Sequence, residues 1–75
     1  MVRCKFYLDK KIEKSAGPGM RVYELEFNPV THGSPENESF FQWTPYGQLK
    51  FGTINEEAAK KFETGKEYYI DISEV

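Results

Sequence analysis

The sequence predicts a mainly β domain that contains one short helix and folds as a small, partly open barrel of five strands. Several segments alternate apolar and polar residues with a period of two, as half-buried strands do. Short connections rich in Gly and Pro join them, and one stretch with helix-capping residues precedes the last segment. The order β-β-β-β-α-β fits an SH3-like or OB-like barrel. A curved five-stranded sheet capped by the helix is the alternative.

The first two predicted strands form a hairpin. Apolar and polar residues alternate over residues 2–8, and Lys-rich residues 10–14 continue the strand along an exposed edge. Residues 15–19 contain Ser, Gly and Pro and predict a turn. The chain returns over residues 20–27, where the parity of the apolar side chains changes and predicts a bulge near Val22.

A polar loop and two aromatic strands are expected next. Residues 31–39 are rich in turn formers and predict a loop. Residues 40–44 predict the third strand, and Thr44-Pro45-Tyr46-Gly47 predicts the turn that leads to the fourth. The apolar faces of these strands and of the last strand supply the expected core, which consists of Phe41, Trp43, Leu49, Phe51, Tyr68, Ile70 and Ile72.

The single helix is expected after Asn55, which is a favourable N-cap residue. Glutamates occupy its first turn, and the pairs Glu56–Lys60 and Glu57–Lys61 have the spacing of stabilising ion pairs. The helix is two turns long and Gly65 lies near its exit. The last strand follows over residues 68–72.

Composition limits the function classes. Residues 1–75 make one domain, near the lower size limit for a self-sufficient core. Ten basic and twelve acidic residues give a net charge of −2, which disfavours strong nonspecific binding of duplex DNA. Cys4 is the only cysteine, so no internal disulfide forms. No apolar stretch is long enough to span a membrane, and we expect a cytoplasmic protein.

No catalytic or metal-binding signature stands out. His32 and Ser34 lie in one short loop without a third partner, so nucleophilic catalysis is not expected. His32, Glu36 and Glu38 lack a recognised metal-ligand spacing, and no phosphate-binding loop is present. We therefore expect a protein that is not an enzyme and that needs no cofactor.

The C-terminal half carries a family resemblance. It contains the run TPYGQLKFGTIN, a short helix ending in Phe62, and the strand Gly65-Lys66-Glu67-Tyr68-Tyr69-Ile70-Asp71. Together, over about residues 39–72, these resemble a widespread group of small uncharacterised accessory proteins of tailed phages and prophages. Tyr46 stands where that group has a small residue. The resemblance implies a phage accessory context in the cytoplasm of a host cell, and it implies no mechanism.

These observations favour a binding protein that sequesters or blocks a host-derived target. The target is either a nucleotide-type defence signal or a host protein. In the nucleotide version, a base stacks on aromatic rings, polar side chains of the loop bind it, and basic side chains neutralise phosphate. The expected ligand-binding residues are His32, Ser34, Asn37, Phe40, Trp43, Tyr46, Arg21 and Lys50.

Two other functions remain open from the sequence. Exposed rings also suit a single-stranded nucleic-acid-binding protein of phage replication or recombination, and a virion or assembly protein ranks third. We further expect a homo-oligomer, most simply a twofold dimer, because rings such as Phe40, Tyr46, Tyr7 and Tyr69 fall off the predicted core face. An edge strand or the Phe40–Tyr46 region is the expected contact.

Overall fold

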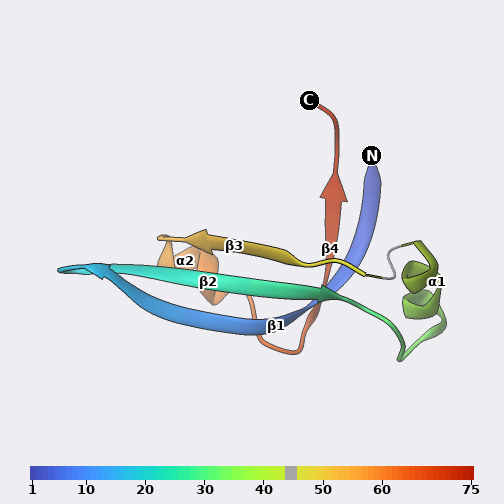
Figure 1. Cartoon of the computed structure of the whole chain (residues 1–75), viewed down its shortest axis with the longest axis horizontal. Helices are drawn as coiled ribbons and strands as arrows, with labels where there is room; N and C mark the ends of the chain where they lie inside the picture. Colours follow the sequence, from blue (N-terminus) through green and yellow to red (C-terminus); the bar gives the residue numbers. More distant parts are fainter. Residues whose placement is uncertain (44–45) are drawn as a thin grey trace.

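The protein forms one open antiparallel sheet with two short helices (Figure 1). The computed structural model describes residues 1–43 and 46–75. The elements are β1 (Val2–Gly17), β2 (Met20–Pro29), α1 (Pro35–Trp43), β3 (Leu49–Thr53), α2 (Glu56–Lys60) and β4 (Glu67–Ile72). The strand order is β3-β2-β1-β4, and every neighbouring pair is antiparallel. The mainly β class and the helix before the last strand are confirmed.

The expected partly open barrel of five strands is wrong, because the described residues form four strands in an open sheet. β3 and β4 lie at the two edges and do not pair with each other. The missing strand is the one expected over residues 40–44, since residues 35–43 form α1 instead. The turn expected over residues 44–47 begins at 44–45, outside the described residues.

β1 and β2 form a long hairpin that extends beyond the core. β1 contains 16 residues, and its ladder with β2 shifts register between Leu8 and Lys10 and again between Ser15 and Gly17. The bulges therefore lie in β1, and the bulge expected near Val22 is wrong. The radius of gyration is 14.1 Å, whereas a compact chain of this length has about 11 Å. The hairpin tip and α1 lie at opposite ends of the 46 Å long axis (Figure 1).

The core occupies one face of the sheet. Alternation along β1 and β2 brings Leu8, Leu25 and Phe27 to this face, where all three are fully buried. The Phe27 ring stacks on Phe51 at 5.8 Å between centroids and meets Phe62 and Tyr68 edge-on, each at 5.9 Å. Aromatic pairs at such distances add to the stabilisation from burial. This cluster compensates for the small size of the domain.

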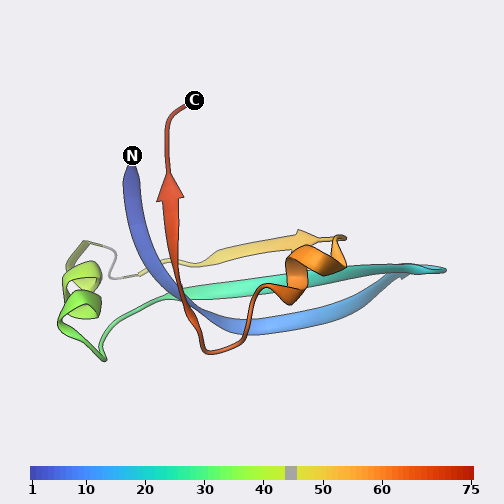
Figure 2. The ribbon, with the colours of Figure 1, turned by 180° about the vertical axis from the view of Figure 1, so that it is seen from behind.

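α2 lies over the same face of the sheet, as Figure 2 shows from behind. Asn55 caps it as expected, since its Oδ1 accepts a hydrogen bond of 3.2 Å from the Ala58 N–H. The expected Glu56–Lys60 ion pair forms at 3.6 Å. Glu57 pairs with Lys60 at 3.7 Å rather than with Lys61, which is the C-cap residue of the helix.

Four residues of the expected core are exposed. Phe41 and Trp43 belong to α1, and 40% and 83% of their surfaces are accessible. Phe51 keeps its stacking contact with Phe27 but lies on edge strand β3, and Ile72 lies at the end of edge strand β4. Leu49, Tyr68 and Ile70 are partly buried against the core, as expected.

Candidate functional site

α1 begins with a set of residues that favour a helix start. The Ser34 hydroxyl accepts a hydrogen bond of 3.0 Å from the Asn37 N–H, which is the N-cap contact. Pro35 follows at the first helical position, where its missing N–H costs nothing. Glu36 and Glu38 then lie in the first turn, next to the positive end of the helix dipole. Local sequence therefore explains why residues 35–43 are helical and not extended.

The helix rests on a polar stripe of the sheet. Lys5 of β1 and Tyr69 of β4 lie opposite each other in the ladder, on the face away from Cys4 and Ile70 because side chains alternate along strands. Glu36 accepts a hydrogen bond from Lys5 Nζ at 2.5 Å and bonds from the Tyr69 hydroxyl at 3.0 and 3.1 Å. α1 is thus anchored at its N-terminal half by charge-assisted bonds.

We call the contacts among Lys5, Glu36 and Tyr69 the anchor. They shift the pKa values of all three side chains. The hydrogen bond from Lys5 is the largest cause that lowers the pKa of Glu36, followed by the bond from Tyr69. The bond with Glu36 raises the pKa of Lys5 and that of the Tyr69 hydroxyl. At neutral pH, Glu36 is therefore charged, Lys5 is protonated and Tyr69 donates.

Asn37 is buried between α1 and the sheet, with 3% of its surface accessible. Its Nδ2 donates to the His32 carbonyl at 3.0 Å and to the Glu67 carboxylate at 2.7 Å. Its Oδ1 is also buried and has no hydrogen-bond donor in the described part of the chain. Asn37 is thus a structural residue that fixes the loop before α1, not a group that faces a ligand.

Beside the anchor lies the ion pair of Arg3 and Asp71. Arg3 Nε and Nη2 donate to the two Asp71 carboxylate oxygens at 2.7 and 3.0 Å, a bidentate geometry. The pair lowers the pKa of Asp71 and raises the pKa of Arg3. The guanidinium also lies 4.8 Å from the centre of the Tyr69 ring, within cation–π range. These contacts hold the guanidinium in one orientation beside α1.

A groove of about 340 Å³ separates the beginning of β1 from the C-terminal half of α1. It is lined by Val2 and Arg3 on β1 and by Ser39, Phe40 and Trp43 on α1. The Phe40 ring lies 6.0 Å from that of Tyr69, so Phe40 closes the groove toward the anchor. The indole of Trp43 is mostly accessible. Ring stacking and apolar contact are therefore possible in this groove.

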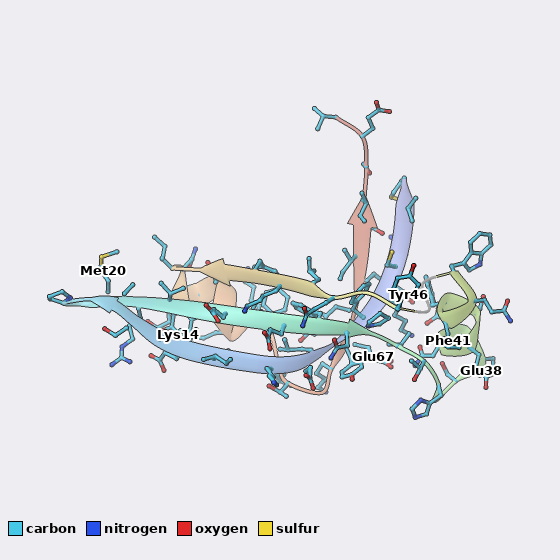
Figure 3. The ribbon with its side chains drawn as sticks, in the orientation of Figure 1. Lys14, Met20, Glu38, Phe41, Tyr46 and Glu67 are labelled. Atoms are coloured by element: carbon cyan, nitrogen blue, oxygen red, sulfur yellow. The ribbon has the colours of Figure 1, made fainter. Side chains whose placement is uncertain are left out.

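Three exposed aromatic side chains lie on α1 or shortly after it in the chain. Phe41, Trp43 and Tyr46 are exposed, and 85% of the surface of Tyr46 is accessible. Figure 3 shows the labelled Phe41 and Tyr46 at the same end of the protein as α1. We call Phe41, Trp43 and Tyr46 the aromatic end.

The structure brings together only some of the expected ligand-binding residues. Phe40 and Trp43 line the groove, and Tyr46 lies at the aromatic end. Ser34 caps α1 and Asn37 is buried, so both serve the fold. The exposed His32 side chain shares a 2.7 Å hydrogen bond with Thr31.

The two expected basic residues lie elsewhere. Arg21 pairs with Glu13 on the hairpin, and Lys50 pairs with Glu26 between β3 and β2. Sequence reasoning missed Val2, Arg3 and Ser39 as groove residues. Their positions depend on the helix that the sequence reasoning did not find, although the Ser34-Pro35-Glu36 sequence was a signal for it.

Other kinds of site receive no support in residues 1–43 and 46–75. These residues contain no group of three His, Cys, Asp or Glu side chains placed to hold a metal ion. Within the same ranges, no helix has the length and apolar character needed to cross a membrane.

Comparison of the chain with family models, with curated proteins and with solved structures gave no match.

Proposed function

We propose that this chain is a non-enzymatic binding protein that blocks a host-derived protein by covering it with the aromatic end. The observation that carries this proposal is the exposure of Trp43 on a helix that the sheet holds through polar contacts. The fold does not use the indole, and Trp and Tyr are the side chains most enriched at the energetic centres of protein interfaces. The resemblance to phage accessory proteins supplies the host context.

The charge around α1 supports a protein target over a phosphate-bearing one. Arg3 and Lys5 are the basic residues of β1 that lie beside α1, and both are paired with carboxylates. The acidic residues there outnumber them, since Glu36, Glu38, Glu67 and Asp71 lie on or beside α1. Such a field repels polyphosphates and suits a neutral or basic protein surface.

The test compares two variants that each lose one exposed apolar side chain. Trp43→Ala removes the indole from the aromatic end, and Met20→Ala removes an exposed side chain at the hairpin tip. Affinity-tagged versions are produced in host cells, and the captured proteins are identified by mass spectrometry. We expect one host protein to be captured by the wild type and by Met20→Ala and to be lost from Trp43→Ala. Equal capture by all three contradicts the proposal.

A nucleotide ligand is a second candidate, and the groove is the observation that favours it. Its volume lies at the lower end of the range for small-molecule sites, and Phe40, Trp43 and Arg3 offer a stacking ring and a cation. Arg3 binds Asp71 through Nε and Nη2, which leaves Nη1 without an acceptor in the described ranges. Native mass spectrometry of protein from infected cells tests this version, together with quenching of Trp43 fluorescence by a nucleotide panel. A bare mass and no quenching remove the nucleotide version alone.

Single-stranded nucleic acid receives less support. Lys14, Arg21 and Lys50 each pair with a glutamate, and the hairpin that carries Lys14 and Arg21 lies far from the aromatic end. Fluorescence anisotropy with labelled oligothymidine at low salt tests it, because such binding depends on phosphate neutralisation. A virion or assembly role is tested by mass spectrometry of purified particles.

A further inference from the structure

One edge of β1 is open next to the groove. β1 pairs with β4 over its first residues, from Val2↔Ile72 to Tyr7↔Glu67, but with β2 only from Phe6↔Pro29 onward. The last bond on the β2 side is donated by the Val30 N–H to the Lys5 carbonyl, at 3.1 Å. From Lys5 back to the start of β1, no other strand in the described part of the chain pairs with β1 on the β2 side.

The pattern of the ladder shows which peptide groups face this open edge. Alternate residues of an antiparallel strand bond to one neighbour or to the other. The Leu8 N–H donates to the Lys66 carbonyl on the β4 side, whereas the Lys5 carbonyl accepts on the β2 side. Val2 therefore bonds toward β4, and the N–H and C=O of Arg3 point to the open edge. Neither group has a partner in the described residues.

An apolar strip continues from the core to the same end of the molecule. Cys4 is buried and Ile70 is partly buried. Val2 and Ile72, the next residues along the same two rows, have 61% and 60% of their surfaces accessible. The apolar side chains of the core face thus continue to Val2 and Ile72, where no other element of the described ranges covers them. The groove with Phe40 and Trp43 borders the same stretch of β1.

The accessible surface of the chain is large for its mass. The total is 5644 Å² for 8.7 kDa, whereas a folded monomer of that mass has about 4,700 Å². The excess is about 900 Å², close to the roughly 800 Å² that each partner buries in a stable interface. Part of this excess belongs to the hairpin that extends beyond the core, and part to the uncovered apolar strip at Val2 and Ile72.

We propose that two copies of this chain form a dimer by antiparallel pairing of the open β1 edges about a twofold axis at Val2. In this register Val2 faces its counterpart as a non-hydrogen-bonded pair, and the Arg3 N–H donates to residue 1 of the second copy. A register centred on Arg3 would place two guanidinium groups directly opposite each other, which is destabilising. The Val2 register instead joins the two apolar strips.

The dimer is independent of the proposed function, although both involve the same end of the protein. The second copy's β1 would border the groove of Val2, Arg3, Ser39, Phe40 and Trp43 and deepen it. A chain that is a monomer and still captures its host protein through Trp43 would refute the dimer and leave the proposed function standing.

The first test uses a matched pair of substitutions at Arg3. Arg3→Ala and Arg3→Pro both remove the ion pair with Asp71, but only Arg3→Pro removes the N–H that faces the open edge. Proline is tolerated on an edge strand where its nitrogen faces solvent. Light scattering at about 100 micromolar should give twice the chain mass for the wild type and Arg3→Ala. Arg3→Pro should weaken dimerisation about tenfold or more. A monomeric wild type, or a dimer that Arg3→Pro leaves intact, overturns the proposal.

The second test remains decisive if Arg3→Pro fails to fold. In a Cys4→Ala background, Val2→Cys places two thiols across the twofold axis with Cα atoms about 4.5 Å apart, within the range of a disulfide. Oxidised glutathione should then convert Val2→Cys into a covalent dimer on a non-reducing gel. Ile72→Cys is the control, because Ile72 is equally exposed but lies on β4, on the other side of β1. Cross-linking of Ile72→Cys in place of Val2→Cys overturns the proposal.

Discussion

The side-chain amide of Asn37 in α1 donates a 2.7 Å hydrogen bond to the carboxylate of Glu67 in β4. The same nitrogen donates to the His32 carbonyl, so both of its hydrogens are used. Its two partners are acceptors, and only a donor fits between them. The structure therefore requires an amide at this buried position.

A carboxylate at position 37 should destabilise the protein strongly. Asn37→Asp keeps the shape of the side chain but places a negative charge against Glu67 and against the His32 carbonyl. We expect the free energy of unfolding to fall by about 2–3 kcal/mol at pH 7, because a buried polar group loses its partner and faces like charge. Urea unfolding followed by circular dichroism measures the change.

The double variant Asn37→Asp/Glu67→Gln is the control for this prediction. The glutamine side chain can donate to the new carboxylate, so most of the lost stability should return. If Asn37→Asp is as stable as the wild type, or if Glu67→Gln gives no recovery, α1 does not dock through this contact.

The anchor of α1 should make stability depend on pH in the acid range. The pKa of Glu36 is lowered in the folded protein by its bonds with Lys5 and Tyr69, whereas a glutamate in an unfolded chain has a pKa of about 4.3. A lowered folded-state pKa stabilises the protein above the unfolded value, and this contribution is lost as the pH falls through the folded value. The midpoint temperature of thermal unfolding should therefore decrease as the pH is lowered below about 4.3.

Glu36→Gln identifies the part of this dependence that belongs to the anchor. The variant should be less stable than the wild type at pH 7, and the difference should narrow as the pH falls below the unfolded value. Asp71, whose pKa Arg3 lowers, continues to contribute in both proteins. Parallel pH profiles for wild type and variant would show that Glu36 does not stabilise the fold.

The parts of the fold that sequence predicted are those governed by local pattern. Alternation over residues 2–8 and the cap at Asn55 depend on near neighbours in the chain, and β1 and α2 form there. The run of aromatic residues over 40–43 was ambiguous, because Phe and Trp favour strands while the preceding Ser34-Pro35-Glu36 favours a helix start. The structure agrees with the helix start, and α1 stands in place of the expected third strand.

The groove was harder to predict because it depends on tertiary position. Phe40 and Trp43 were expected to bind ligand and do line it, but Arg21 and Lys50 pair with glutamates on the other strands. The cation beside the groove is Arg3, from the other end of the chain. Only the pairing of β1 with β4 and the docking of α1 on that pair bring Arg3 to this place. Neither is visible in a local pattern.

The start of α1 can be tested with two Ser→Ala substitutions that should differ in their effect on stability. Ser34→Ala removes the N-cap acceptor of the Asn37 N–H and should cost about 1 kcal/mol of stability. Ser39→Ala lies inside α1 on an exposed position, where alanine has the higher helix propensity, and should be neutral or stabilising by up to about 0.5 kcal/mol. Chemical denaturation measures both. Equal effects would indicate that residues 34–43 are not a capped helix.

The division between core and surface aromatics gives the sharpest contrast in stability. Phe27 is buried among Phe51, Phe62 and Tyr68, so Phe27→Ala leaves a cavity in the centre of the aromatic cluster. We expect a loss of about 3–5 kcal/mol, which approaches the whole stability of a small domain. Trp43→Ala deletes a larger side chain, but one that solvent already surrounds.

Trp43→Ala should therefore change the free energy of unfolding by no more than about 0.5 kcal/mol. Guanidinium unfolding of both variants, followed by far-UV circular dichroism, makes the comparison independent of tryptophan fluorescence. A loss of several kcal/mol in Trp43→Ala would show that the indole packs in the core, and would remove the basis for a binding surface at the aromatic end. A stable Trp43→Ala that no longer captures its host protein would separate folding from binding at a single side chain.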